Sequence, residues 1–139
     1  MNAIAKDFLL NNAHFAVVGA STNRSKVGNQ VLRWYQDRKL PVTPINPKEP
    51  TVEGLQSVTS VSELPDPKNT ALSIITPPSV TLKTLQDAHA AGITYVWLQP
   101  GTDNEEVISY AKQNGFKFVA GGPCILVMGD SLLQQGSRL

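Results

Sequence analysis

A loop of small polar residues that carries two cations follows a short apolar run near the N-terminus of this 139-residue sequence. Residues 15–18 are apolar, and residues 19–28 read Gly-Ala-Ser-Thr-Asn-Arg-Ser-Lys-Val-Gly, with Arg24 and Lys26 as the cations. Apolar residues then recur at helical spacing, namely Val27, Val31, Leu32 and Tyr35. The start of a helix leaves backbone N–H groups without partners and favours anions through its dipole. The stretch therefore predicts a strand, a phosphate-binding loop and a helix.

The glycine spacing in this loop differs from that of two common phosphate-binding motifs. A dinucleotide fingerprint, G-x-G-x-x-G, would need glycine at positions 21 and 24, which hold serine and arginine. A P-loop would need glycine before Lys26 and serine or threonine after it, and the sequence has neither. Gly28 comes nine positions after Gly19, which gives a longer loop. An ordinary polar turn between a strand and a helix is the alternative.

Composition and charge restrict the class of protein. A net charge of +1 and a hydrophobic fraction of 41% are typical of a soluble globular domain and argue against a nucleic-acid-binding surface. No apolar run approaches the roughly 20 residues that span a bilayer, and Lys6 and Asp7 interrupt the apolar N-terminal stretch. A single cysteine, Cys124, agrees with a reducing compartment. We expect one cytoplasmic domain covering residues 1–139, with neither nucleic-acid nor membrane partners.

Short apolar runs alternate with amphipathic stretches along the chain. This alternation predicts a doubly wound α/β fold, with a mainly parallel, five-stranded, Rossmann-like sheet and helices on both faces. Strands are expected at residues 15–18, 42–46, 70–75, 95–99 and 116–120, and helices at 27–38, 80–91 and 105–114.

The ends of the chain and its long connection carry other signals. Ile4, Phe8 and Leu9 predict a helix within residues 1–12 that lies across one edge of the sheet. Residues 49–69 are expected to cover the sheet. Capping boxes are expected at two places, residues 60–63 and 102–105. A polar tail is expected over residues 128–139, either packed on the body or frayed.

Two further loops are expected beside the phosphate loop. Ligands of open parallel sheets bind at the carboxyl ends of the strands, so three loops should converge: residues 19–28, 46–48 and 76–78. Where NAD sites usually carry an acid, this sequence has Asn46 and Lys48. A lysine suits an additional phosphate, such as the 3′-phosphate of CoA or the 2′-phosphate of NADP, and a solvated surface lysine is the alternative. Pro77 and Pro78 provide either an apolar wall for a nucleotide or only a helix start.

The chain resembles a known family over nearly its whole length. The segments V-V-G-A-S, K-V-G, V-T-P-I-N-P-K and I-I-T-P-P are similar to the CoA-binding domain of succinyl-CoA synthetase alpha subunits and ADP-forming acyl-CoA synthetases. The likeness is greatest to the stand-alone, single-domain members, and I-N-P-K is its most specific piece. The resemblance implies coenzyme A as the cofactor. In the large synthetases the phosphorylated histidine lies in a separate domain that this sequence lacks, which implies binding without catalysis.

Cys124 is the residue that could carry covalent chemistry. It ends a Gly-Gly-Pro-Cys segment after the fifth predicted strand, where the related synthetases carry a G-P-N-C-like segment; the Asn is missing here. A thiol with a lowered pKa could exchange acyl groups with CoA, whereas a buried, inert cysteine is the commoner outcome. His14 and His89 have no evident second ligand nearby, so no metal is expected.

The function expected from the sequence is binding of coenzyme A or acyl-CoA by a regulatory or carrier module without evident catalytic machinery. The alternatives are an NADP-dependent oxidoreductase, and an acyl-transfer protein or subunit that uses Cys124. Either a homo-oligomer or a partner protein is compatible with these functions. The residues expected to bind the cofactor come from the three loops: Gly19, Ala20, Ser21, Thr22, Asn23, Arg24, Lys26, Val27, Gly28, Asn46, Pro47, Lys48, Thr76, Pro77 and Pro78.

Overall fold

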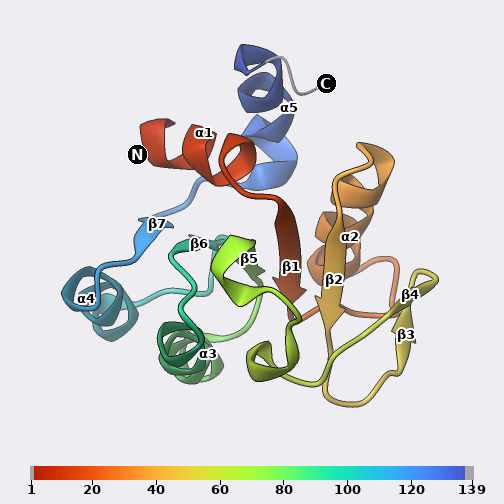
Figure 1. Cartoon of the computed structure of the whole chain (residues 1–139), viewed down its shortest axis with the longest axis horizontal. Coiled ribbons are helices and arrows are strands. Elements are labelled where there is room, and N and C mark those ends of the chain that lie inside the picture. Colours follow the sequence, from red (N-terminus) through yellow and green to blue (C-terminus); the bar gives the residue numbers. More distant parts are fainter. Residues whose placement is uncertain (1, 137–139) are drawn as a thin grey trace.

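A five-stranded parallel sheet forms the centre of the structure, a computed structural model that describes residues 2–136 (Figure 1). The strands lie in the order β2 (Val42–Ile45), β1 (His14–Val18), β5 (Thr70–Ile74), β6 (Tyr95–Leu98) and β7 (Lys117–Val119). Every neighbouring pair is parallel. After β2 the chain returns past β1 to form β5, so the strand order reverses between β1 and β5. Ligands of open α/β sheets bind at such a switch point.

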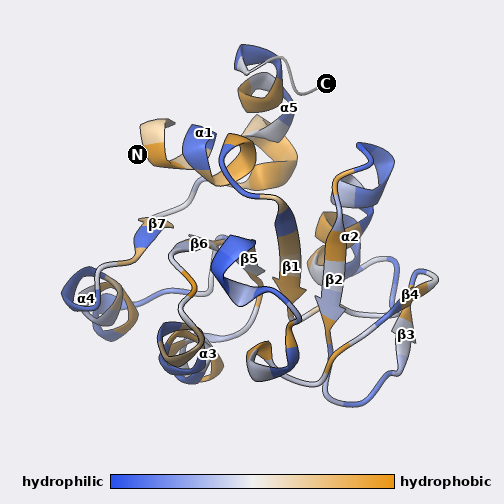
Figure 2. Cartoon of the chain, in the orientation of Figure 1, coloured by the Kyte–Doolittle hydropathy of each residue, from blue (hydrophilic) through white to orange (hydrophobic). Residues whose placement is uncertain are grey.

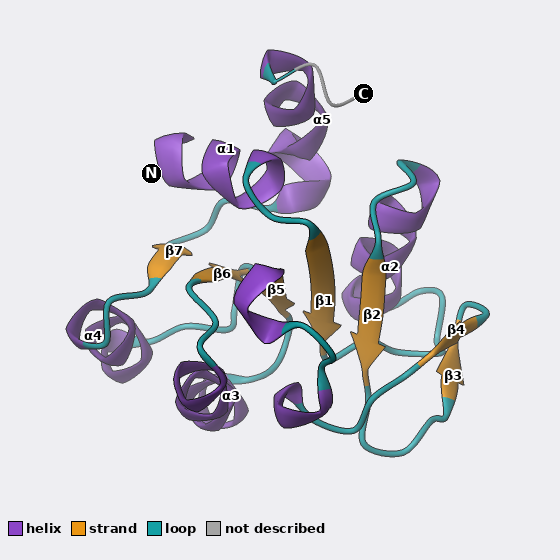
Figure 3. Cartoon of the chain, viewed as in Figure 1, coloured by secondary structure: helices purple, strands orange, loops and turns teal. Residues whose placement is uncertain are grey.

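Helices cover both faces of this sheet (Figure 3). One face packs against α1 (Asn2–Leu10), α2 (Val27–Asp37) and α5 (Ile125–Gln135), and the other against α3 (Pro78–Ala91), α4 (Glu105–Gln113) and the 3₁₀ turn η1 (Val61–Glu63). Side-chain alternation along β1 separates the two layers, because Phe15 and Val17 face the first and Ala16 and Val18 the second. The doubly wound α/β fold predicted from the sequence is confirmed. No helix in residues 2–136 combines the length and apolar character needed to cross a bilayer.

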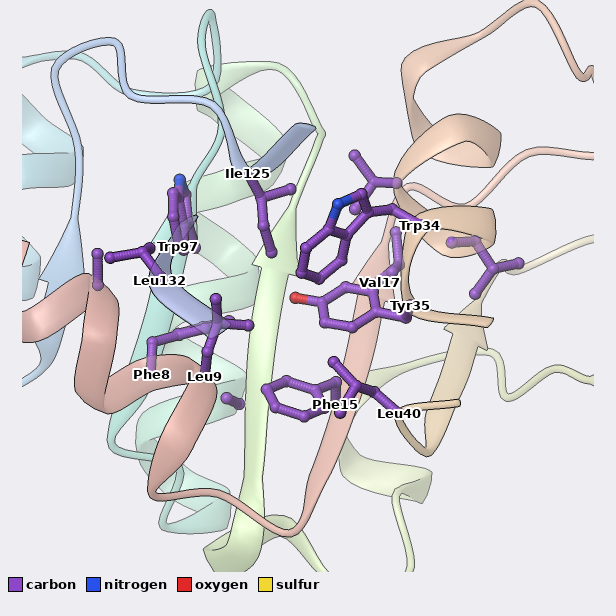
Figure 4. Packing of buried hydrophobic residues seen from close by; sticks show 14 of the residues in the cluster. Phe8, Leu9, Phe15, Val17, Trp34, Tyr35, Leu40, Trp97, Ile125 and Leu132 are labelled. Carbon is purple, nitrogen blue, oxygen red and sulfur yellow. The ribbon is translucent and has the colours of Figure 1, made fainter. Parts of the chain in front are cut away.

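Aromatic side chains fill the core between the sheet and the first layer (Figure 4). The Phe8 ring centroid lies 5.5 Å from that of Trp97, and Phe15 stacks on Tyr35 at 4.9 Å. The Tyr35 hydroxyl hydrogen-bonds Ser73 of β5 at 2.7 Å, and burial raises the pKa of Tyr35 far above its usual value, so the phenol stays neutral. Figure 2 shows apolar residues concentrated on β1 and where α1 meets α5. This core fixes the strand from which the predicted phosphate loop leaves.

The two terminal helices correct two sequence-based predictions. α1 lies on a face of the sheet and not across its edge, because Phe8 packs against Trp97 of β6. Residues 125–135 form α5, so the tail predicted from residue 128 packs on the body, which is one of its two alternatives, and does so as a helix that the sequence does not predict. Leu132 and Leu133 are buried in that helix, while its polar outer face and internal glycine weaken the helical pattern. The end of the predicted tail, residues 137–139, lies outside the described residues.

The connection between β2 and β5 contains elements that its composition does not indicate. β3 (Thr51–Val52) and β4 (Leu55–Gln56) form an antiparallel hairpin beyond β2, and the 3₁₀ turn η2 (Pro67–Asn69) leads into β5. Figure 1 shows this hairpin at the opposite end of the sheet from α4. The hairpin therefore lies on the side of the sheet where β2 and α2 meet the first loop.

Neither predicted capping box has its full set of hydrogen bonds. The Ser60 side chain makes no capping bond, and the Glu63 carboxylate accepts mainly from Thr59, at 2.6 Å, with a weaker contribution from the backbone N–H of Ser60. The cap of α4 is Asn104, whose side-chain oxygen accepts from the N–H of Val107 at 2.9 Å, and not residue 102. Elsewhere the predicted boundaries of strands and helices agree with the structure within two residues.

Candidate functional site

Two glycines shape the phosphate loop, residues 19–28. Gly19 has a φ of +91°, a conformation that side chains with a Cβ rarely adopt. A Cβ on Gly28 would lie 2.1 Å from the carbonyl oxygen of Gly19, so only glycine lets the start of α2 rest on the end of β1. Lys26, the N-cap of α2, makes no side-chain capping bond. The first turn of α2 therefore keeps backbone N–H groups for an anion.

A cavity of about 470 Å³, here called the anion cavity, lies against this loop. Its walls come from the loop and from the carboxyl end of β5: Gly19, Ser21, Ser25, Lys26, Val27, Gly28, Ile75, Thr76 and Pro77. Asn23 holds the loop in shape, since its side-chain oxygen accepts from the N–H and the hydroxyl of Ser25 at 3.0 and 2.7 Å. The cavity thus has a helix N-terminus and a lysine, Lys26, in its walls, which suits a phosphate or diphosphate.

A second cavity, of about 290 Å³, adjoins the first and is more apolar, so it is here called the apolar cavity. Gly19 and Thr76 line both cavities. The other walls come from β1, β2, α3 and the segment before and within η1: Val18, Ile45, Pro47, Thr59, Ser60, Val61, Val80, Thr84 and Asp87. The two cavities lie side by side at the β1–β5 switch point and are together called the edge groove here. One part of it suits an anion and the other a flat apolar group.

Asn46 joins the second loop to the first. Its side-chain nitrogen donates to the carbonyl oxygen of Ala20 at 2.9 Å, and its side-chain oxygen accepts from the N–H of Lys48 at 2.7 Å. The Asn46 carboxamide is thus occupied within the protein and orients the turn that follows it. Lys48 is exposed and lines a neighbouring hollow, which shares Pro47 and Thr59 with the apolar cavity. The three loops therefore converge as the sequence predicts.

Comparison with known proteins decides the family. Residues 13–130 match the model of the CoA binding domain. The chain belongs to this family. It is 27% identical over 135 residues to the alpha subunit of ADP-forming acetate–CoA ligase II of Pyrococcus furiosus, covering 88% of this chain and 29% of that protein. This CoA-binding domain thus spans less than a third of the length of the curated relatives that it matches.

Solved structures agree with this family. A hypothetical protein from Pyrococcus horikoshii OT3 superposes with a TM-score of 0.86 at 28% identity, covering 96% of this chain and 92% of that one. The dinucleotide-forming acetyl-coenzyme A synthetase 1 of Ca. Korarchaeum cryptofilum, in complex with phosphate and ADP, superposes with a TM-score of 0.73 at 30% identity. That match covers 86% of this chain and 27% of the synthetase. The CoA-binding domain therefore has counterparts of similar length and others within longer enzymes.

The predicted cofactor residues of the CoA-binding domain divide into two groups. Those that line the edge groove are Gly19, Ser21, Lys26, Val27, Gly28, Pro47, Thr76 and Pro77. Those outside its walls are Ala20, Thr22, Asn23, Arg24, Asn46, Lys48 and Pro78. Lining a cavity does not test binding, so the cofactor roles of both groups stay predictions.

Arg24 lies apart from the groove, although the sequence places it in the phosphate loop. Its Nε atom is 3.6 Å from a carboxylate oxygen of Glu53 on the β3–β4 hairpin, and its side chain is 67% exposed. Conversely, the apolar cavity uses residues that sequence reasoning missed, among them Thr59 and Val61. These come from the connection after β2, where no local pattern marks a binding wall. Val80 begins the helix predicted at residues 80–91, and only the structure shows that its side chain lies on the cavity wall, 47% exposed.

Cys124 and the histidines lie outside the edge groove. Cys124 is the half-buried N-cap of α5, and its thiol makes no capping hydrogen bond. His14 is the first residue of β1, at the end of the strand opposite the groove. His89 of α3 packs against the ring of Phe116 at 6.2 Å between centroids. Within residues 2–136, no three His, Cys, Asp or Glu side chains gather as ligands for a metal ion.

Proposed function

We propose that this chain binds coenzyme A or an acyl-CoA in the edge groove. The observation that carries the proposal is the adjacency of the two cavities, in which an anion-binding loop and an apolar cavity share Gly19 and Thr76 as walls. CoA has the matching sequence of groups, because its diphosphate is linked to an adenosine. The family to which the chain belongs supports this ligand.

The diphosphate fits the phosphate loop. Lys26 supplies a cation, and the first turn of α2 supplies backbone N–H groups. The adenine fits the apolar cavity, where Val18, Ile45 and Val61 offer flat contacts. Both assignments use residues of the described chain.

The 3′-phosphate of CoA is assigned to Lys48. The hollow lined by Lys48 adjoins the apolar cavity through Pro47 and Thr59, so a phosphate on the adenosine ribose would reach it. This assignment separates CoA from NAD, which lacks a phosphate there. NADP remains a competitor on charge alone, but the family comparison favours CoA.

The proposal assigns binding, and not ligation, to this chain. The curated relatives are ligases, and this chain aligns with under a third of their length. The proposal therefore extends to this chain only the CoA-binding role of the family to which it belongs.

Calorimetric titration tests the proposal. Purified protein is titrated with CoA, dephospho-CoA, NADP and NAD, and the series is repeated with Lys48→Ala and with Lys112→Ala, an exposed lysine on α4 as the matched control. We expect Lys48→Ala to weaken CoA binding about tenfold, because one charge-assisted contact is lost, and to leave dephospho-CoA binding unchanged. Heat with NADP and none with CoA would overturn the proposed function. If Lys48→Ala and Lys112→Ala bind CoA with equal affinity, the role assigned to Lys48 is wrong, while the proposed CoA binding stands.

A further inference from the structure

Glu53 occupies the turn of the β3–β4 hairpin in a conformation that its residue type does not favour. The two turn residues, Glu53 and Gly54, have φ values of +50° and +78°. A two-residue hairpin turn with positive φ at both positions favours Asn, Asp or Gly at the first, where a longer side chain is strained. The geometry of the turn therefore does not explain a glutamate, and the use of its side chain must be sought elsewhere.

The Glu53 carboxylate lies directly behind the phosphate loop. One of its oxygens accepts a hydrogen bond from the side-chain nitrogen of Asn29 at 2.9 Å. The same nitrogen donates to the carbonyl oxygen of Ser21, also at 2.9 Å, and Asn29 is fully buried. The backbone oxygen of Glu53 accepts from Gln36 at 3.0 Å, which holds the hairpin on α2. A carboxylate is thus fixed one hydrogen-bonded side chain away from the residues that line the anion cavity.

The Glu53 carboxylate also pairs with Arg24, one of the two cations of the phosphate loop. Arg24 Nε is 3.6 Å from the Glu53 oxygen, and the Glu53 side chain is only 20% exposed, so water screens it less than it screens Arg24. The Arg24 backbone is fixed separately, because its carbonyl oxygen accepts from the Arg33 guanidinium at 3.0 Å. Only the long side chain of Arg24 is therefore free to turn. In this structure it turns toward Glu53 and lines neither cavity of the edge groove.

We propose that Glu53 lowers the affinity of the phosphate loop by holding Arg24 away from it. A bound diphosphate must compete with the Glu53 carboxylate for the Arg24 guanidinium. Glu53 is thus a residue that sets affinity without touching the ligand. The inference rests on the proposed function, because the competing anion is the diphosphate of CoA.

A substitution that removes the charge of Glu53 tests this proposal, because the expected result is a gain of affinity, which misfolding cannot imitate. Glu53→Gln keeps the length of the side chain and an oxygen that can accept from Asn29, while it removes the charge. We expect CoA to bind Glu53→Gln about 2- to 5-fold more tightly than the natural chain, as the release of one partly exposed ion pair allows. Glu53→Asn, which suits the turn and also lacks the charge at that place, should gain affinity as well.

Two controls identify the route. In an Arg24→Gln background, Glu53→Gln should give little further gain, because the cation that it releases is missing. Glu106→Gln changes the net charge equally, on α4 at the other end of the sheet, and should leave the affinity unchanged. An unchanged or weaker affinity in Glu53→Gln overturns the proposal, as does a full gain without Arg24.

Pyrophosphate as a second probe separates this inference from the proposed function. It carries the diphosphate chemistry alone, without the adenosine. A gain for pyrophosphate in Glu53→Gln, with no CoA binding by any variant, would support the inference and defeat the proposed function. If CoA binds, but Glu53→Gln gains affinity for neither CoA nor pyrophosphate, the proposed function would be supported and the inference about Glu53 would be defeated.

Discussion

Gly28, at the start of α2, lies so close to the carbonyl oxygen of Gly19, at the end of β1, that a Cβ would be 2.1 Å from it. The contact brings the helix N-terminus to the carboxyl end of the strand. The anion cavity is built on this approach, because both glycines line it.

Gly28→Ala should therefore separate α2 from β1. We expect the free energy of unfolding to fall by about 1–3 kcal/mol, the usual range for an overpacked site, despite the better helix propensity of alanine. Pyrophosphate and CoA should both bind at least tenfold more weakly. Denaturant unfolding and calorimetry check the two effects, with Ser79→Ala, an exposed residue of α3, as the control. Unchanged pyrophosphate affinity would contradict the role of this approach.

Filling the apolar cavity should separate its contribution from that of the loop. Val80 is 47% exposed on the cavity wall, so Val80→Trp can cover the cavity without overpacking the core. We expect CoA affinity to fall at least tenfold and pyrophosphate affinity to stay the same. Val127→Trp is the matched control, because Val127 is 85% exposed on α5 and lines neither cavity. Equal losses for CoA and pyrophosphate would argue against an adenine site here.

The pair of Arg38 and Asp130 joins α2 to α5 and should make stability depend on pH. Hydrogen bonding from Arg38 lowers the pKa of Asp130, although partial burial opposes the effect and the charge of Arg38 adds to it. The second contact of this bidentate pair measures 2.9 Å. Because the folded pKa is below the unfolded one, the stabilisation is present above the unfolded pKa and is lost as pH falls through the folded pKa.

Asp130→Asn should therefore be less stable than the natural chain at neutral pH, by about 0.2–1 kcal/mol, the range for exposed pairs. The difference should shrink as pH falls below about 4, the ordinary pKa of aspartate. Urea unfolding at a series of pH values measures it, with Glu106→Gln as the control. A difference that does not change with pH would show that the pair contributes through packing alone.

Gly129 in the middle of α5 should resist substitution. A Cβ there would lie 2.3 Å from the Trp34 ring, because α5 packs against α2 at this point. We expect Gly129→Ala to lower the free energy of unfolding by about 1–3 kcal/mol. In an exposed helix the same change would raise it by up to about 1 kcal/mol, so the sign tells a packed α5 from a frayed one. Denaturant unfolding measures that sign.

Cys124 should be dispensable for CoA binding. Its thiol leaves the N-cap of α5 without a side-chain bond, and serine is a better cap, so Cys124→Ser should keep or slightly raise stability. CoA affinity should change less than twofold, since Cys124 lines neither cavity. Intact-mass spectrometry after incubation with acetyl-CoA should find no adduct. A thioester on Cys124 would instead favour the acyl-transfer alternative.

The sequence by itself determined the parts that local chemistry controls. The apolar run before Gly19, the small residues after it and the helical spacing from Val27 specify a strand, a loop and a helix through the preferences of neighbouring residues. Repetition of that pattern fixes the fold class, and parallel strands bring their carboxyl ends to one edge. Those two facts sufficed to predict that the three loops converge.

Only the tertiary structure decided which distant side chains share a space. Asn46 hydrogen-bonds Ala20, the Arg24 side chain pairs with Glu53 of the hairpin, and Val61 lines the apolar cavity. α5 likewise packs on α2 because Gly129 fits against Trp34, although a glycine within a helix is unfavourable on propensity alone. The physical reason is that such contacts depend on how layers pack after the chain has closed, and no pattern within one segment records what another segment will bring beside it.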